Sequence, residues 1–286
     1  MELEDCYHQV NGITLHTVEA GDRRGNCMIL LHGFPEGWYG WKEQILFFAR
    51  KGYRVIVPDQ RGYNRSSKPA GIRSYCLQHL VADIAALIRQ VTDKKAVLAG
   101  HDWGGSVAWH LALHHAYLLS HLVIVNMPHP DVFKKTVRTK PAQMWRSNYA
   151  AFFQLPMLPE WVSRAFHFAL LERSLLKTSN KGTFSREDIT VYKEAWRQPG
   201  ALTAMINWYR AYKHNSLTAS GIIQMPALLI WGRKDRFLLS EMAQASIDRC
   251  LHGKLVMIDD ATHWVLHEQP QVVNNLIDDF ITTQQG

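Results

Sequence analysis

An aspartate between two glycines, in Gly100-His101-Asp102-Trp103-Gly104, is the segment of this chain best suited to covalent chemistry. It follows the apolar run 96–99 and precedes a helical pattern, so it matches the sharp strand-to-helix turn Gly-x-nucleophile-x-Gly. So tight a turn leaves no room for a nearby Cβ, and the helix amino end that follows favours an ionised carboxylate. We therefore predict Asp102 as the nucleophile; the alternative is a plain helix N-cap.

A histidine and a second aspartate follow two later apolar runs. His263 comes just after the run 254–258, and Asp235 comes after the run 227–230. Because open α/β sheets place their sites at the carboxyl ends of the strands, both can face Asp102 there. The chain order nucleophile, acid, histidine also fits this kind of turn. Asp235 is predicted to orient His263. Asn126 is a weaker candidate for that role, because an amide has no charge to stabilise an imidazolium.

The segment His32-Gly33-Phe34-Pro35 follows another apolar run, 27–31. The backbone N–H of Phe34, together with that of Trp103, is predicted to form an oxyanion hole. A tight turn that needs Gly and Pro is the alternative explanation, and both can hold together.

A carboxylate nucleophile restricts the reaction. Asp102 is already ionised at neutral pH and needs no base to activate it. Its attack on an ester or amide would give an anhydride, whereas its attack on a saturated carbon gives an ordinary ester. The expected electrophile is therefore an epoxide or a carbon that bears a halide. His263 then acts in the second step, where it deprotonates the water that hydrolyses the ester.

The leaving group separates these two substrates. An epoxide oxygen becomes an alkoxide and needs acid donors, whereas a halide needs only N–H donors. Tyr149 and Tyr209 are candidate acids, because a phenol can bond the epoxide oxygen and donate its proton as that oxygen becomes basic. Taken alone, either tyrosine is more often a packing or surface residue.

The elements that must position these residues alternate between strand and helix. A hairpin with an Asn11-Gly12 turn is predicted first, followed by strands at 27–31, 53–57, 96–99, 122–125, 227–230 and 254–258. Helical spacing occurs at 41–50, 77–91, 104–115, from about 240, and at 272–282. Apolar strands without alternation indicate a mostly parallel sheet covered on both faces.

This rhythm breaks between about residues 130 and 223, where no clear strand occurs and aromatic residues cluster. We predict a core formed by 1–129 and 224–286 and an inserted helical cap, or lid, formed by 130–223. Five residues are expected to line an apolar substrate pocket: Trp38, Phe152, Phe153, Met127 and His32.

Several motifs resemble the epoxide hydrolases of the α/β-hydrolase fold family, and the resemblance covers essentially the whole chain. They are the first turn with Glu36-Gly37-Trp38, Asp59-Gln60-Arg61-Gly62-Tyr63, the Asp102 turn with Gly105, Asn126-Met127-Pro128-His129-Pro130, and Asn207-Trp208-Tyr209-Arg210. The resemblance implies a mostly parallel eight-stranded sheet with helices on both faces and an inserted lid. It also implies Tyr209 and Tyr149 as the ring-opening acids and a vicinal diol as product.

Two departures bear on this resemblance. The family often has Tyr-Phe-Gln followed by Pro-Gly, where this chain has Phe152-Phe153-Gln154-Leu155-Pro156. Haloalkane dehalogenases share the first-turn and Asp102 motifs, but they commonly add a side-chain donor in the first turn, and Phe34 has none. A dehalogenase stays the alternative enzyme. A non-catalytic binding protein of the same fold is the alternative of another class.

Composition adds few constraints. The net charge is +7, but the longest basic runs are pairs, so a solvated basic surface is expected rather than a nucleic-acid site. The four cysteines have no zinc-type spacing, and no metal or cofactor is implied. The acidic start and the lack of a long apolar run predict a cytoplasmic protein without stable membrane insertion. The expected partners are a small apolar epoxide and water, with a monomer or homodimer as assembly.

Overall fold

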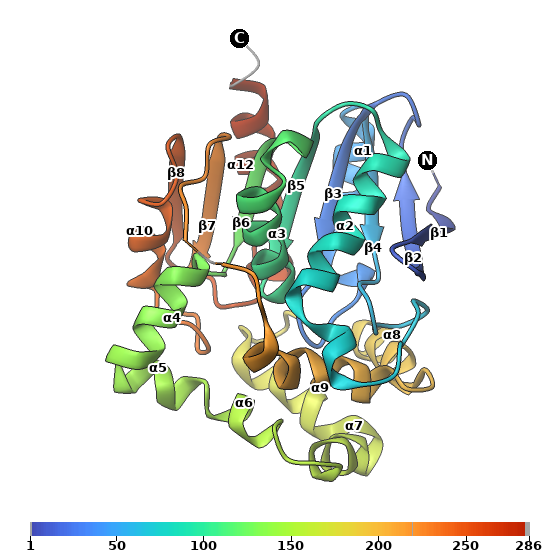
Figure 1. Cartoon of the computed structure of the whole chain (residues 1–286), viewed down its shortest axis with the longest axis vertical. Coiled ribbons are helices and arrows are strands. Elements are labelled where there is room, and N and C mark those ends of the chain that lie inside the picture. The colour runs from blue at the N-terminus through green and yellow to red at the C-terminus, as the bar shows by residue number, and fades with distance from the viewer. Residues whose placement is uncertain (1, 219, 284–286) are drawn as a thin grey trace.

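The chain folds around one mixed sheet of eight strands (Figure 1). The computed structural model describes residues 2–218 and 220–283. The strand order is β1-β2-β4-β3-β5-β6-β7-β8, antiparallel from β1 to β4 and parallel from β4 to β8. The strands are β1 Glu4–Val10, β2 Ile13–Ala20, β3 Asn26–Leu31, β4 Tyr53–Pro58, β5 Ala96–His101, β6 Leu119–Val125, β7 Ala227–Gly232 and β8 Gly253–Ile258.

The predicted hairpin is confirmed. Val10 pairs with Ile13, and the two residues between them, Asn11 and Gly12, have φ of 47° and 76°. Positive φ at both central positions matches the strand twist, which is why Asn-Gly is favoured in such turns.

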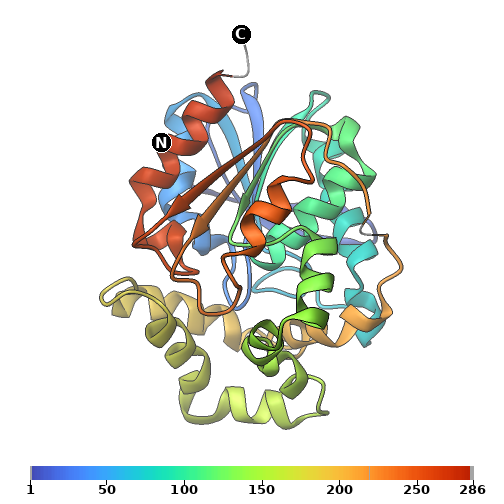
Figure 2. The same cartoon turned by 90° about the vertical axis from the view of Figure 1, so that its left-hand side faces the viewer.

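The sheet is buried on both faces, as its unbroken apolar strands predict. In β3, Met28 and Leu30 face one core cluster, whereas Ile29 and Leu31 face the other. Helices α1, α11 and α12 cover the first face, and α2, α3 and α10 cover the second (Figure 2). Their bounds are α1 Lys42–Arg50, α2 Leu77–Val91, α3 Trp103–His114, α10 Met242–Ile247, α11 Val265–Glu268 and α12 Pro270–Thr283. The α/β-hydrolase architecture is thereby confirmed.

Six α-helices of the described residues lie between β6 and β7 and gather below the sheet in Figure 1. We call them the inserted helices: α4 Pro130–Thr139, α5 Pro141–Arg146, α6 Asn148–Phe152, α7 Leu158–Thr178, α8 Arg186–Arg197 and α9 Ala201–Ala211. Helix α7 is interrupted at 165–168, where the backbone leaves helical geometry. The division into a core and a separate cap at 130 and 223 stays a prediction.

Two buried indoles fasten the inserted helices to the core. Trp196 Nε1 donates to the carbonyl of Pro35 at 2.6 Å, and Trp208 Nε1 donates to the carbonyl of Arg61 at 3.0 Å. Both acceptors belong to loops that follow core strands, so α8 and α9 are held directly over the strand ends. None of the described helices is both long enough and apolar enough to cross a bilayer.

Candidate active site

Asp102 stands at a strained turn between β5 and α3. Its φ of 49° and ψ of −122° lie outside the regions that non-glycine residues normally occupy. The neighbouring backbone explains the required glycines, because a Cβ on Gly33 would lie 2.4 Å from the Cβ of Asp102 and one on Gly104 would lie 2.3 Å from the carbonyl oxygen of Leu31. The turn is thus kept by close packing on both sides of the carboxylate.

The two oxygens of Asp102 have different surroundings. Oδ1 accepts a hydrogen bond of 2.9 Å from the backbone N–H of Phe34. Oδ2 lies 3.6 Å from Nε2 of His263, which is too long for a hydrogen bond. Trp103 follows as the first residue of α3, and its N–H makes no hydrogen bond to Asp102 in the described part of the chain. Oδ2 is therefore the oxygen with freedom to react.

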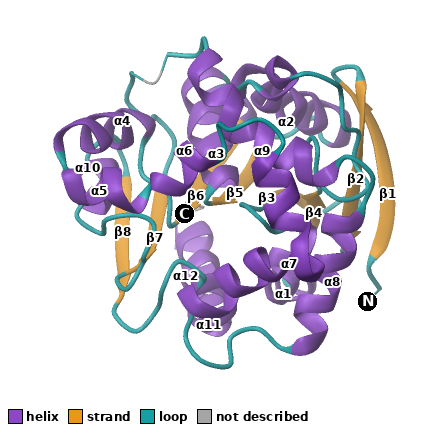
Figure 3. Cartoon of the chain, turned by 90° about the horizontal axis from the view of Figure 1, so that it is seen from below, coloured by secondary structure: helices purple, strands orange, loops and turns teal. Residues whose placement is uncertain are grey.

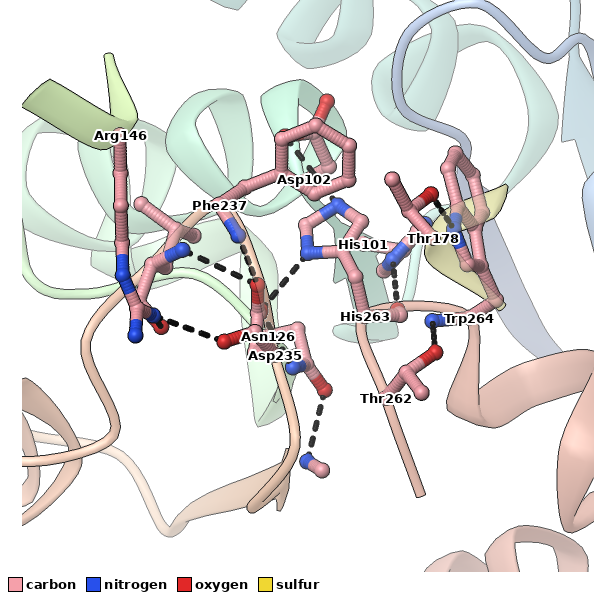
Figure 4. Close-up of polar contacts among 12 residues, drawn as sticks. His101, Asp102, Asn126, Arg146, Thr178, Asp235, Phe237, Thr262, His263 and Trp264 are labelled. Carbon is pink, nitrogen blue, oxygen red and sulfur yellow. Dashed lines mark hydrogen bonds and ion pairs between the residues drawn. The ribbon is translucent and has the colours of Figure 1, made fainter. Parts of the chain in front are cut away.

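His263 lies between the two aspartates that the sequence singles out (Figure 4). Its Nδ1 is 2.8 Å from Oδ2 of Asp235, and both side chains are almost fully buried. Since a carboxylate can only accept, the ring donates through Nδ1, which leaves Nε2 directed at Asp102. The structure thus brings together the three residues that are far apart in the sequence.

Charge couples these groups. Burial alone would lower the pKa of His263, but the carboxylates of Asp235 and Asp102 outweigh it and raise that pKa to about 10. Burial would likewise raise the pKa of Asp102, but the neighbouring imidazolium of His263 and the N–H of Phe34 lower it. In the resting protein the three side chains therefore form a buried anion–cation–anion set.

Asn126 has a different place from the one considered in the sequence. It does not contact His263; its Nδ2 donates to Oδ2 of Asp235 at 2.7 Å, while its Oδ1 accepts from the N–H of Gly232 at 3.0 Å. The other oxygen of Asp235 accepts from the N–H groups of Phe237 and Leu238, at 2.7 and 3.0 Å. Asn126 is thus a positioning residue that fixes the carboxylate of Asp235.

A cavity of about 580 Å³ opens onto Asp102 and His263. Tyr149 of α6 and Tyr209 of α9 both line it, with ring centroids 5.8 Å apart. Burial, and then the negative charge of nearby groups including Asp102, raises the pKa of both phenols, so both keep their proton at neutral pH. The inserted helices therefore place two O–H donors over the carboxylate.

The last residue of the Asn207-Trp208-Tyr209-Arg210 motif holds this arrangement. Arg210 donates from Nε to the carbonyl of Phe153 at 2.9 Å, also bonds the carbonyl of Leu155 at 2.5 Å, and pairs with Glu160 at 2.5 Å. It therefore ties α9, which carries Tyr209, to the end of α6, which carries Tyr149.

The predicted pocket residues divide into two groups. Phe152 and Phe153 line the cavity, but Trp38, Met127 and His32 do not. Trp38 packs against the core cluster on the α1 and α12 face, and Met127 packs beside the Cα of Gly105. These three residues follow strand ends, but their side chains point into the core, which corrects the expectation.

His32 and the walls of the cavity complete this picture. Nδ1 of His32 bonds the carbonyl of Gly33 at 2.9 Å, and its Nε2 accepts from the N–H of Gln60 at 3.1 Å, so it braces two loops. The remaining walls, which the sequence did not point to, include Asn148, Val162, Leu170, Leu171, Ser174, Phe237 and Trp264.

A buried carboxylate that the sequence analysis did not assign lies behind the site. Glu36 accepts from the hydroxyl of Tyr192 and bonds Nε2 of His267, each at 2.7 Å. Its Oε2 is 3.3 Å from Nδ1 of His101, the residue before Asp102. Nε2 of His101 in turn bonds the backbone carbonyl of His263 at 2.9 Å. An acidic residue directly after Pro35, in an apolar context, was the only signal for it.

Among the described residues, no group of three or more His, Cys, Asp or Glu side chains is arranged so that it could hold a metal ion.

Comparison with known proteins places this geometry in a family. Residues 26–270 match the family described as alpha/beta hydrolase fold. The AB hydrolase superfamily protein YfhM of Bacillus subtilis is 48% identical over 96% of both chains. Epoxide hydrolase 4 of Mus musculus is 38% identical over 95% of this chain and 78% of its own. A mutant epoxide hydrolase from Bacillus megaterium, solved with its product (R)-3-[1]naphthyloxy-propane-1,2-diol, superposes with a TM-score of 0.87 at 28% identity, over 97% and 100% of the chains.

Replacing Glu36 with Gln should destabilise the protein by about 3 kcal/mol, because it leaves two buried imidazoles without their anion. The histidines hold the pKa of Glu36 well below its usual range, against the opposing effect of burial. Its stabilising contribution is therefore present above the usual glutamate pKa of about 4.3 and is lost as the pH falls through the depressed value. Urea unfolding at pH 8, and at a series of pH values from 4 downward, measures this.

Glu194→Gln, on the exposed side of α8, is the matched control and should unfold like the wild type. Equal stability of Glu36→Gln and Glu194→Gln at pH 8 would contradict the role given to Glu36.

Proposed function

This chain is an α/β hydrolase of the epoxide hydrolase family, and we propose that it converts epoxides to vicinal diols through an ester on Asp102. One observation carries the proposal: a carboxylate with one oxygen held by a backbone N–H faces a cavity into which two tyrosines point. That combination supplies a nucleophile for carbon and a proton donor for oxygen in one enclosed space.

Ring opening starts with Oδ2 of Asp102. This oxygen attacks a ring carbon, the bond from that carbon to the epoxide oxygen breaks, and the oxygen takes a proton from Tyr149 or Tyr209. The N–H of Phe34 stays on Oδ1, which becomes the carbonyl oxygen of the new ester. The backbone contact thus selects which carboxylate oxygen reacts.

Ester hydrolysis uses the other half of the site. His263 removes a proton from water, whose oxygen attacks the carbonyl carbon of the Asp102 ester. The tetrahedral oxyanion at Oδ1 is stabilised by the N–H of Phe34 and, as it moves out of plane, by the N–H of Trp103. Collapse breaks the ester bond, and the leaving oxygen takes the proton that His263 removed from water. The tyrosinate left by ring opening regains its proton from His263 once the ester has formed, and the acid then released on Asp102 gives its proton back to His263, so Asp102 is again a carboxylate.

Electrostatics explains how one histidine can serve as a base despite its raised pKa. The ester is neutral, so ester formation removes the anion that lies 3.6 Å from Nε2 of His263. At an effective dielectric constant of 20 this interaction is worth on the order of 4 kcal/mol, or about 3 pH units. Alkylation of Asp102 therefore converts His263 from a cation into a base.

A haloalkane dehalogenase is less well supported by the described residues. A halide would need side-chain N–H donors beside Asp102 that are free to bind it. The indole of Trp103 is already engaged with the hydroxyl of Tyr209, and its ring packs against Trp208 and Tyr209, with centroids 5.7 and 5.1 Å away. The indole N–H of Trp264, which does line the cavity, already donates to Thr178 Oγ1 at 2.8 Å.

The substrate class follows from the cavity. Apart from the reacting groups, its walls are mostly aromatic and aliphatic side chains of α6, α7 and the loop at Phe237. A cavity of about 580 Å³ admits an epoxide with a bulky apolar substituent. The aromatic diol bound by the Bacillus megaterium relative fits this class. We propose aryl or extended alkyl epoxides as substrates.

His263→Gln should trap the ester, because ring opening does not need the imidazole but hydrolysis does. Intact-mass spectrometry after incubation with styrene oxide should show the protein heavier by one epoxide. The double variant Asp102→Asn with His263→Gln should show no adduct, and His121→Gln, a buried histidine on β6, should turn over normally. Unchanged mass with diol formed at the wild-type rate would exclude the ester mechanism.

Tyr149→Phe combined with Tyr209→Phe should abolish ring opening, since no acid is left to protonate the alkoxide. Each single variant should lower kcat/KM for styrene oxide by roughly 10²-fold or more. Tyr63→Phe is the control, because Tyr63 is buried beside His32 and its hydroxyl has no hydrogen-bond partner in the described chain. Retained activity of the double variant would remove the tyrosines as acids, and halide release from haloalkanes would favour the dehalogenase.

The pH profile should separate the two steps. When hydrolysis limits turnover, kcat should fall on the acid side as His263 becomes protonated, with a midpoint near pH 7. This is about 3 units below the pKa of His263 in the resting protein, which is about 10, because the Asp102 ester carries no charge. Asp235→Asn removes the second anion and should lower this midpoint further. An acid limb of kcat centred near pH 10 would contradict the coupling between Asp102 and His263.

A further inference from the structure

The positive charge of the protein is concentrated in one segment. Residues 130–223 hold 14 of the 32 lysines and arginines but only 6 of the 25 aspartates and glutamates, a formal charge of +8. The remainder of the chain therefore carries −1, and the whole chain +7. The basic residues look scattered in the sequence, but the excess of positive over negative charge belongs to this segment.

Two of the six acidic side chains of this segment pair with cations of the same segment. Glu160 pairs with Arg210 and Glu172 pairs with Lys193, each at 2.5 Å. Arg164, Arg173 and Lys177, by contrast, are exposed on α7 and form no ion pair with any other described residue. Similar exposed cations, Lys134, Lys135 and Arg138, lie on α4. The surface field of these helices is therefore positive.

Large apolar side chains are exposed on the same helices. We call them the aromatic face: Met144 and Trp145 of α5, Met157 before α7, and Trp161 and Phe166 of α7. Trp145, Met157, Trp161 and Phe166 are 76, 79, 72 and 89% exposed. Helices α5, α6 and α7 run along the side of the molecule away from the sheet (Figure 1), and the view from that side has them in front (Figure 3).

We propose that the aromatic face docks the protein on an anionic lipid bilayer. Tryptophan prefers the boundary between headgroups and acyl chains, and nearby lysines and arginines are attracted to anionic headgroups. Exposed indoles among unpaired cations on one outer side of the inserted helices supply both interactions. The docking is peripheral and needs no spanning helix.

The cavity adds a geometric reason. Leu170 and Val162 of α7 line it, and Leu170 is also 43% exposed. An apolar wall therefore continues from the neighbourhood of Trp161 and Phe166 toward Asp102. A docked protein could take an apolar compound directly from the lipid. The docking itself does not depend on which reaction the site performs.

A second copy of the chain fits this face less well. Two copies related by a twofold axis would bring the same cations together, and like charges oppose such a contact. Anionic lipid removes that repulsion, so charge complementarity selects the bilayer.

The test is sedimentation with sucrose-loaded vesicles of phosphatidylcholine with or without phosphatidylglycerol, using the full chain. The wild type should bind the mixed vesicles and lose binding as salt is raised. Arg164→Glu with Lys177→Glu should lower the partition coefficient by at least roughly 25-fold, since each cation contributes about fivefold. Trp161→Ser should weaken binding at high salt as well. Neither variant touches the cavity, so hydrolysis of a water-soluble epoxide should be unchanged.

The matched controls reverse two exposed lysine charges, and remove one exposed aromatic ring, at places outside the aromatic face. Lys94→Glu with Lys95→Glu alters two exposed lysines before β5, and Tyr117→Ser alters an aromatic that is 59% exposed on the core. Both should bind like the wild type. Absence of wild-type binding, or an equal loss in the Lys94 and Lys95 variant, would overturn the proposal. A dimer in sedimentation velocity that Trp161→Ser dissolves would instead assign the face to self-association.

Discussion

One imidazole held between two carboxylates sets the conditions for the rest of the structure. Asp102 and Asp235 lie on either side of His263. Asp235 and His263 are almost fully buried, and Asp102 faces the enclosed cavity, so the two anions need the cation between them. Every step that changes the charge of one member changes the proton affinity of the others. In the proposed mechanism the nucleophile therefore controls the proton affinity of the base.

The surrounding backbone is arranged to keep these charges in place. Asp235 receives two backbone N–H groups and the amide of Asn126, whereas Asp102 receives the N–H of Phe34. Each of these donors comes from the segment that follows a parallel strand, because parallel strands end at the same edge of the sheet. Glu36 also holds the site in place from the side of the core: it lies beside His101 and bonds Tyr192 of the inserted helix α8.

The sequence predicted the strands, most helices of the core and the order of the three charged residues, since these depend on local periodicity and chain order. It could not predict where a side chain points once its strand has ended. Trp38 and Met127 follow strand ends as Phe34 and Asp102 do, but they turn into the core. The sequence assigned no role to Glu36, although it belongs to the first-turn motif, because its partners His101, Tyr192 and His267 lie far apart in the sequence. The charge of the inserted helices escaped notice for a similar reason: no basic run is longer than two residues.

The two proposed roles place opposite requirements on the inserted helices. Tyr149 and Tyr209 must keep a fixed relation to Asp102, whereas the aromatic face must adapt to whatever it contacts. Arg210 meets the first requirement, because its bonds to the carbonyls of Phe153 and Leu155 join α6 to α9, and its ion pair with Glu160 fastens the first turn of α7 to them. Non-helical backbone at 165–168 interrupts α7 beyond this junction. Adjustment of α7 after residue 168 can thus be absorbed at the interruption, while Arg210 keeps the first turn of α7, α6 and α9 together.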